Sequence, residues 1–214
     1  PAGQSATGVI RGRGCCRTRA VPESLSELRQ RYVVDGRPMP AAVEAALRDD
    51  PRAGAASILA AVERRRKKNR AEGQRLRKML QYERALYREG LTLLAGVDEV
   101  GMSPLAGPVV SAAVILPKGF RLAGVDDSKK LDAPTRERLA AEIRAQAVCW
   151  AIGAVEPEEI DRINIYHAGL LSMRRAIEGL SCAPEHVLID ARKLDGVPVP
   201  QTPIIKGDAK SLSI

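Results

Sequence analysis

The sequence predicts an α/β domain preceded by a helical N-terminal region, and three patterns carry this prediction. Short apolar runs bounded by glycine and proline recur in the second half of the chain, which is typical of buried strands. These runs are Leu93–Val97, Val109–Leu116, Val148–Val155, His186–Ile189 and Pro203–Ile205. Segments with apolar residues at helical spacing separate them, at 134–147 and 157–180. Helical spacing also dominates residues 22–88, so we expect helices first and a sheet after them.

The composition is that of an ordinary globular protein. Of the 214 residues, 45% are hydrophobic and 28% are charged, which suits one full domain and a smaller one. No apolar run reaches the length of a membrane span, and no secretion signal is recognisable. The two histidines and four cysteines follow no zinc or disulfide spacing, so a Cys/His zinc site or a histidine-based triad is not expected. We expect a monomeric, cytoplasmic protein without membrane contact.

The charge is distributed unevenly along the chain. Residues 1–95 hold 20 Lys and Arg against 10 Asp and Glu, whereas the remainder holds 14 against 16. A basic front half joined to a mildly acidic back half indicates an arm that binds a polyanion beside a site that collects acids. Aromatic residues make up only 3% of the chain, which argues against stacking on single-stranded bases as the main binding mode.

We divide the chain into three parts on these patterns. Residues 1–20, rich in Gly, Arg and Ser, are expected to be disordered. Residues 21–92 are expected to form a basic helical extension, and residues 93–214 the domain that contains the sheet.

Three helices are expected in the basic extension. Ser24 and Glu27 have the spacing of a capping box at the start of the first. The second is expected at about 41–47, and the third, the longest, at about 52–88. Within the third lies a dense charge run, 63–70. Such a run is either a solvated helix face or a stripe of phosphate contacts, which would be independent of sequence and sensitive to salt.

Three of the apolar runs lead to an acidic residue. Asp98 and Glu99 follow the first run and Asp190 ends the fourth, and we expect Asp208 likewise at the end of the strand formed by the fifth. Solvated acids at strand ends are the ordinary interpretation, since charged residues are mostly exposed. If the strands instead end at the same edge of one sheet, all four carboxylates meet there. Neighbours on a strand point to opposite faces, so Asp98 and Glu99 share a site only where the strand bends.

Four close carboxylates repel one another and raise one another's pKa unless cations neutralise them. Ligand sets made only of oxygen select hard ions such as Mg²⁺ or Mn²⁺. Two such ions form the usual clamp for in-line displacement at a phosphodiester. The basic front half and the acidic site together therefore indicate a nuclease that uses two Mn²⁺ or Mg²⁺ ions.

Six short motifs stand in order in the second half of the chain. They are Gly96–Gly101 (GVDEVG), Leu105–Val110 (LAGPVV), Asp127–Leu131 (DSKKL), Glu159–Ile165 (EIDRINI), Leu188–Asp190 (LID) and Lys206–Ser211 (KGDAKS). With these motifs, the sequence from about Leu93 to Ile214 resembles the type 2 ribonuclease H family, ribonuclease HII. The helical segment that ends in Tyr82 and Glu83 also resembles the N-terminal extension of some bacterial members.

The resemblance implies a ribonuclease H-like fold, with a mixed sheet flanked by helices. It also implies an endonuclease, with a role in DNA replication and repair, that leaves 5′-phosphomonoesters. Its partners would be RNA–DNA hybrids and duplex DNA with single embedded ribonucleotides. By motif position, Asp98, Glu99, Asp190 and Asp208 would be both the metal ligands and the catalytic residues.

The loop after the acid pair departs from the family pattern. Members usually carry Gly-Arg-Gly, a loop that grips the ribonucleotide and its following phosphate, whereas this chain has Gly101, Met102 and Ser103. By position these three residues are assigned to substrate binding. Met102 provides no cationic fork, and Ser103 adds a side chain where a close backbone approach is wanted. Selectivity for the ribose is the property that this departure affects.

Other assignments leave alternatives open. Ser128, Lys129 and Lys130 are candidates for phosphate contacts, and a polar surface loop has the same composition. Trp150 is expected in the core. The family continues beyond the KGDAKS motif into further elements, so we expect the C-terminal part of the domain to be missing. The alternative function, motivated by the altered loop and the short end, is a non-catalytic protein that binds RNA–DNA hybrids.

Overall fold

The computed structural model of the chain describes residues 23–103 and 106–214. The segment expected to be disordered, 1–20, lies outside the described residues. The chain divides into two compact units, Pro1–Lys67 and Lys68–Ile214, and the division falls inside a long helix. None of the helices in the described residues combines the length and the hydropathy that a membrane span requires.

The first unit contains short helices around a small apolar core. Helix α1 (Leu25–Arg29) continues into a π-helical turn (Gln30–Val34), and α2 (Ala41–Arg48) and the start of α3 (Ala53–Met79) follow. The predicted capping box is confirmed, because Ser24 Oγ accepts a hydrogen bond from the Glu27 backbone and the Glu27 carboxylate accepts one from Ser24 N. The buried residues shared by these elements are Leu28, Tyr32, Met39, Leu47, Ala55, Ile58 and Val62.

Two arginines of the charge run are bound within this unit. Arg65 Nη1 donates to the Tyr32 carbonyl at 2.7 Å, and Arg66 Nη1 donates to Glu44 Oε2 at 2.7 Å. The other basic residues of the run are exposed. Arg65 and Arg66 of the run therefore hold the short helices in place, and its other basic residues form an exposed basic surface.

The prediction of one helix over 52–88 was wrong. Helix α3 ends at Met79, and a separate helix α4 (Gln81–Arg88) begins after Leu80, whose φ of −84° and ψ of 15° are not helical. Periodicity alone could not locate this break, because apolar residues continue at helical spacing across it.

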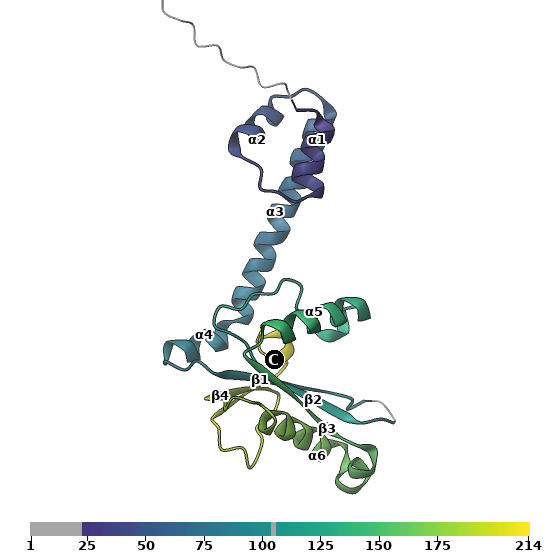
Figure 1. The fold of residues 1–214 in the computed structure, drawn as a ribbon, viewed down its shortest axis with the longest axis vertical. Helices are drawn as coiled ribbons and strands as arrows, with labels where there is room; N and C mark the ends of the chain where they lie inside the picture. The colour runs from purple at the N-terminus through teal and green to yellow at the C-terminus, as the bar shows by residue number, and fades with distance from the viewer. Residues whose placement is uncertain (1–22, 104–105) are drawn as a thin grey trace, which may run out of the picture. The chain divides into compact units, whose positions relative to one another are not determined.

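The second unit is built on a five-stranded mixed sheet (Figure 1). Its strands are β1 (Leu94–Val100), β2 (Val109–Ile115), β3 (Cys149–Val155), β4 (His186–Asp190) and β5 (Gln201–Ile204). They lie in the order β3-β2-β1-β4-β5. The pairs β1/β2 and β2/β3 are antiparallel, and β1/β4 and β4/β5 are parallel.

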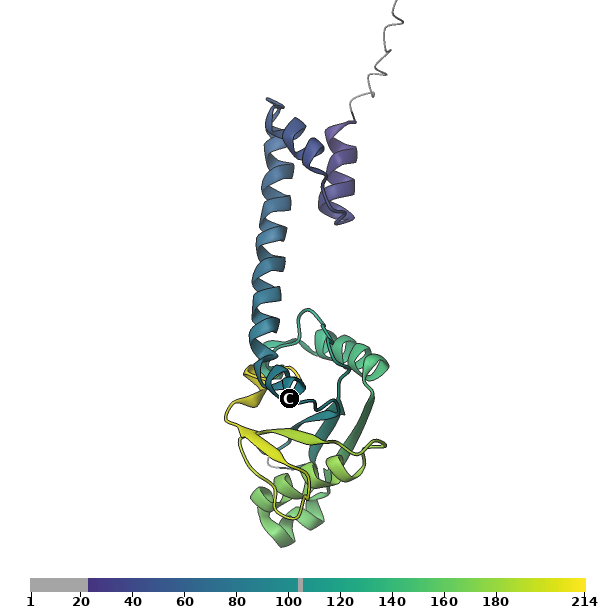
Figure 2. The same ribbon diagram turned by 90° about the vertical axis from the view of Figure 1, so that its left-hand side faces the viewer.

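Helices lie on both faces of this sheet (Figures 1 and 2). Helix α6 (Pro157–Glu178) packs against β1, β2 and β3. The contact is close, because Gly153 of β3 faces the backbone of α6 and the Ser111 and Ser172 hydroxyls form a buried hydrogen bond of 2.6 Å. On the other face, Leu139 of α5 (Ala133–Gln146) belongs to an apolar cluster that includes Met79. The predicted fold class, a mixed sheet flanked by helices after a helical N-terminal region, is confirmed.

The prediction that Trp150 lies in the core was wrong. In β3 the side chains alternate strictly, and Trp150 and Ile152 point away from α6 and are 44% and 56% exposed. A run of apolar residues does not reveal which strand face stays open, since that depends on which elements pack against it.

Candidate metal and nucleic-acid site

The parallel pairing of β1 and β4 brings acidic residues from two distant segments to one edge of the sheet. Val97 of β1 lies opposite Ile189 of β4, and the next residues along the two strands are Asp98 and Asp190. Because parallel strands run in the same direction, both acids follow their buried apolar runs at the same edge. Glu99 follows in β1, which continues to Val100.

Three carboxylates meet at this edge. Asp98, Glu99 and Asp190 each offer an oxygen, and these oxygens all lie within 4.8 Å of one another. All three residues are half-buried. Asp98 Oδ1 also accepts a hydrogen bond from the backbone N–H of Glu99 at 2.8 Å, which holds the Asp98 side chain beside its neighbour.

Asp208 lies beside this group but is placed differently from the prediction. Strand β5 ends at Ile204, and Asp208 sits in the 3-10 turn Gly207–Ala209, not at the end of a strand. The chain leaves the strand direction at Lys206, whose φ is +59°. Gly207 N donates to Asp190 Oδ1 at 2.6 Å, so the turn that carries Asp208 is bonded directly to the acidic edge.

Burial and mutual repulsion both act on the carboxylates at this edge. Burial raises the pKa of Asp98 to about 7, and the neighbouring charges of Glu99, Asp190 and Asp208 act in the same direction. Burial also raises the pKa of Glu99, with the charge of Asp190 adding to the effect. Bringing carboxylates together in this way is unfavourable unless cations bind between them.

The donor set fits a hard divalent cation. Every side chain of the group offers carboxylate oxygen, the ligand that Mg²⁺ and Mn²⁺ prefer, and no histidine or thiolate belongs to it. Asp98, Glu99 and Asp190 are therefore the residues that could hold such an ion, with Asp208 next to them.

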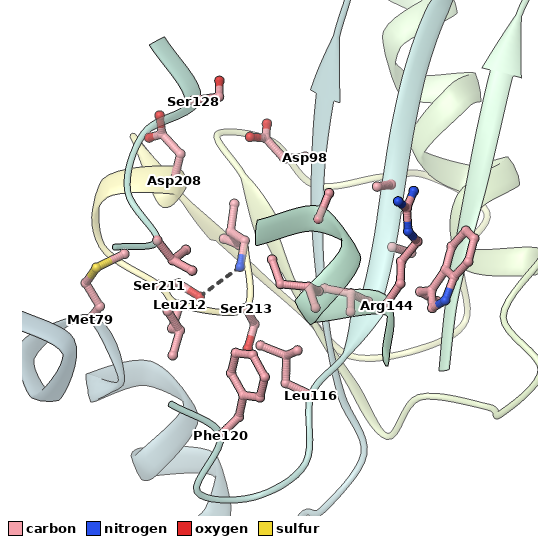
Figure 3. Close-up of a pocket in the computed structure, with 18 of the residues that line it drawn as sticks. Met79, Asp98, Leu116, Phe120, Ser128, Arg144, Asp208, Ser211, Leu212 and Ser213 are labelled. Carbon is pink, nitrogen blue, oxygen red and sulfur yellow. Dashed lines mark hydrogen bonds between the residues drawn. The ribbon is translucent and has the colours of Figure 1, made fainter. Parts of the chain in front are cut away.

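The segment Ser128–Lys130 forms a short 3-10 turn near the acidic edge. Ser128 lies at the same end of a pocket as Asp98 and Asp208 (Figure 3). Lys129 is exposed, and its charge lowers the pKa of Glu99. Lys130 is paired with Asp126, with its Nζ 3.1 Å from the carboxylate oxygen. The structure thus brings Ser128 and Lys129 to the site and engages Lys130 elsewhere.

In the loop that follows the acid pair, the side chain of Met102 points into the protein. Gly101 has a φ of +96°, and a side chain there would collide with the Pro108 carbonyl. Met102 is half-buried in an apolar cluster with Val109 and packs against Gly169 of α6. Ser103 is exposed. The loop therefore presents backbone and a hydroxyl, but no cation, beside the acidic edge.

Two functional candidates were missed from the sequence. Arg192, two residues after Asp190, is exposed, and its charge lowers the pKa of Glu99. Glu83 of α4 is fully buried, and its Oε1 accepts hydrogen bonds from Ser211 Oγ at 2.7 Å and Ser213 N at 3.0 Å. Glu83 could have been found, because it continues the buried helical spacing of Met79.

A pocket of about 390 Å³ opens beside the acidic edge (Figure 3). Asp98 and Asp208 lie at one end of it, and apolar side chains such as Leu116 and Phe120 line the rest. The fold and the acidic edge together define a ribonuclease H-like α/β protein with a candidate divalent-metal site.

The family follows from comparison with known proteins. A family model described as Ribonuclease HII matches residues 95–214, and one described as Ribonuclease HII N-terminal domain matches residues 36–87. The chain belongs to the ribonuclease HII family, whose members are hydrolases of the endoribonuclease class.

Individual relatives carry the same name. The chain is 60% identical over 192 residues to a ribonuclease HII of Myxococcus xanthus (strain DK1622), a match that covers 89% of this chain and 66% of that protein. It is 58% identical over 191 residues to a ribonuclease HII of Anaeromyxobacter sp. (strain Fw109-5), covering 89% and 61%. The chain thus spans somewhat less than two thirds of the length of these relatives.

Among solved structures, the crystal structure of ribonuclease H2 from Pyrococcus horikoshii OT3 is similar. Its TM-score is 0.49 and its sequence identity 25%, and the match covers 55% of this chain and 64% of that one. A ribonuclease HII from Archaeoglobus fulgidus, solved in complex with PCNA, is similar at a TM-score of 0.46 and 28% identity, covering 56% and 65%.

Proposed function

We propose that this chain carries the active site of a metal-dependent endoribonuclease that cleaves the RNA strand of RNA–DNA hybrids. We also propose that it cuts at single ribonucleotides embedded in duplex DNA and leaves 5′-phosphomonoesters. The observation that supports this most is the meeting of Asp98, Glu99 and Asp190 within 4.8 Å. Family membership supports the substrate class.

Asp98, Glu99, Asp190 and Asp208 are the proposed ligands for two Mn²⁺ or Mg²⁺ ions. Such ions, when bound, would supply charge stabilisation at the phosphodiester and activation of the attacking water. The protein's own contribution is to hold the carboxylates in place before substrate arrives. The β1/β4 pairing fixes Asp98 and Asp190, and the bond from Gly207 N to Asp190 holds the turn of Asp208.

Substrate contacts are proposed for the residues around this edge. Lys129 and Ser128 would touch backbone phosphate, and Gly101, Met102 and Ser103 would face the ribose strand through their backbone, with the Ser103 hydroxyl exposed beside it. We assign the chemistry to residues 93–214 and duplex binding to the basic extension, 21–92. The exposed cations of the charge run support the second assignment.

The test is a cleavage assay on duplex DNA carrying one ribonucleotide, with Mn²⁺ or Mg²⁺. An all-DNA duplex and the Asp190→Asn variant are the controls. Cleavage on the 5′ side of the ribonucleotide, abolished by the variant, is expected. The assay is repeated with a chimera that adds the remaining third of the Myxococcus xanthus relative, since this chain spans 66% of it. If both forms bind hybrid in EDTA and neither cleaves with metal, the protein is a hybrid-binding protein and the nuclease proposal fails.

A further inference from the structure

The chain makes an unusual turn directly after Asp190. Arg192 N donates a hydrogen bond to the Asp190 carbonyl at 2.7 Å, across a single intervening residue. That residue, Ala191, has a φ of +57°, a left-handed conformation that alanine rarely adopts. A three-residue turn with positive φ at its centre is rare and strained. Strained turns persist where the surrounding structure holds them, often at functional sites.

The turn directs Arg192 onto an aromatic platform. Its guanidinium lies 4.4 Å from the ring centroid of Tyr166, on α6. A cation over a tyrosine face is attracted by the ring, and the planar guanidinium is well suited to stacking. Tyr166 is itself 43% exposed, so the stacked pair stands at the protein surface.

The guanidinium has no anionic partner within the described residues. None of the ion pairs there includes Arg192, and its side chain donates no hydrogen bond to them. It is nevertheless near the acidic edge, because Arg192 follows Asp190 by two residues and its backbone N–H is bonded to the Asp190 carbonyl. Five N–H donors are thus held beside the carboxylates with their hydrogen-bonding capacity unused.

The loop that follows the acid pair, 101–108, supplies no cation to this part of the surface. Met102, in the loop after the acid pair, packs against Gly169, one helical turn after Tyr166. That loop therefore approaches the same stretch of α6 but contributes no positive charge. Lys129, the other cation that acts on Glu99, belongs to the separate turn Ser128–Lys130.

We propose that Arg192, held against Tyr166 by the strained turn at Ala191, binds a backbone phosphate of the substrate strand next to the acidic edge. The inference rests on the proposed function for the substrate class. Arginine suits this role because its planar fork matches two phosphate oxygens. Tyr166 is a positioning residue, which orients the fork without touching the phosphate.

The test measures binding without cleavage, so that its result is independent of catalysis. A fluorescein-labelled RNA–DNA hybrid is titrated in EDTA at several NaCl concentrations, and Kd is followed by anisotropy. Arg192→Ala is expected to weaken binding about tenfold and to lower the slope of log Kd against log salt by about 1. The matched control is Arg138→Ala, an exposed arginine of α5 that is already paired with Glu142, which should leave the slope unchanged.

Three further variants separate binding from positioning. Arg192→Lys keeps the charge but not the fork, so it should retain the salt slope and lose part of the affinity. Tyr166→Phe keeps the ring and should bind like the unchanged chain. Tyr166→Leu removes the stacking face and should weaken binding about threefold.

Two results would overturn the proposal. One is that Arg192→Ala binds the hybrid in EDTA with unchanged Kd and unchanged salt slope. If that variant then differs only in the Mn²⁺ concentration that it binds, Arg192 acts on Glu99 and not on the substrate. The other is that the chain without substitutions either fails to bind the hybrid or binds it with a Kd that does not depend on salt. Failure of the proposed function would give a different result: no cleavage with Mn²⁺ or Mg²⁺, although the variants still differ in hybrid binding as described.

Discussion

The carboxylate of Glu83, in α4, accepts a hydrogen bond from the hydroxyl of Ser211 at 2.7 Å, across 128 positions of the chain. Glu83 is fully buried, and its second oxygen has no hydrogen-bond partner in the described residues. Ser211 follows the turn that carries Asp208 by two residues. The bond therefore ties a helix matched by the N-terminal family model to the segment beside the acidic edge.

Removing this acceptor should destabilise the fold. Glu83→Ala leaves the Ser211 hydroxyl and the Ser213 N–H buried without a partner, and we expect a loss of about 2–4 kcal/mol in the free energy of unfolding. Glu83→Gln keeps an acceptor oxygen and nearly the same volume, so its loss should be below about 1 kcal/mol. Urea denaturation measures both. Glu137→Ala, at an exposed position of α5, is the control and should change little. Equal losses for Gln and Ala would contradict the hydrogen-bond explanation.

Stability in EDTA should depend on pH through Asp98. Its pKa is raised from the ordinary 3.8 to about 7 in the folded chain, so between these values the folded state keeps a proton that the unfolded chain releases. The contribution of Asp98 is therefore most favourable below pH 3.8 and is lost as the pH rises through about 7. The total change is at most about 4 kcal/mol.

The comparison with Asp98→Asn isolates this effect from other titrating groups. The difference in unfolding free energy between the variant and the unchanged chain should grow in favour of the variant from pH 4 to about pH 7 and then level off. Urea denaturation across this range, without divalent ions, is the measurement. Parallel pH profiles for the two proteins would show that Asp98 titrates normally in the folded chain.

Divalent cations should stabilise the folded chain through the acidic edge. At an Mn²⁺ concentration one hundred times Kd, binding to the folded state adds about 2.7 kcal/mol, which thermal melting detects. Asp190→Asn should lose most of this gain, because Asp190 belongs to the group within 4.8 Å. Asp208→Asn should lose less, since Asp208 lies outside that group. Asp161→Asn, on the exposed side of α6, should respond like the unchanged chain. If Asp161→Asn also loses the stabilisation by Mn²⁺, the ion does not bind at the acidic edge.

The close contact between β3 and α6 should tolerate no side chain at Gly153. A Cβ there would collide with the Ser172 carbonyl and the Ala176 backbone nitrogen, which belong to a helix backbone that cannot turn aside. Gly153→Ala should therefore lower the free energy of unfolding by about 1–3 kcal/mol or more. Gly73→Ala, where no atom lies within 4 Å of the added Cβ, should instead raise it by about 0.5–1 kcal/mol, because alanine is favoured over glycine inside a helix. Two changes of the same sign would contradict this packing.

Much of the fold could be predicted from local patterns. Apolar runs identified the strands β1 to β4, and helical spacing identified α1, α2, α5 and α6, because each of these elements buries one face with the period of its own backbone. The strand β5 and the break at Leu80 were predicted less well. A strand of four residues is too short to show a clear periodicity, and one non-helical residue does not interrupt the helical spacing around it.

The sequence by itself determined the elements and the acidic residues that follow their apolar runs, because backbone periodicity and residue chemistry are local properties. Only the tertiary structure decided which of these acids meet. The parallel register of β1 and β4 sets Asp98 and Glu99 beside Asp190, and the turn at Lys206 keeps Asp208 slightly apart. The inward packing of Met102, the stacking of Arg192 on Tyr166 and the burial of Glu83 against Ser211 likewise depend on partners far away in the chain. Contacts of this kind arise from packing between elements, which no local pattern records.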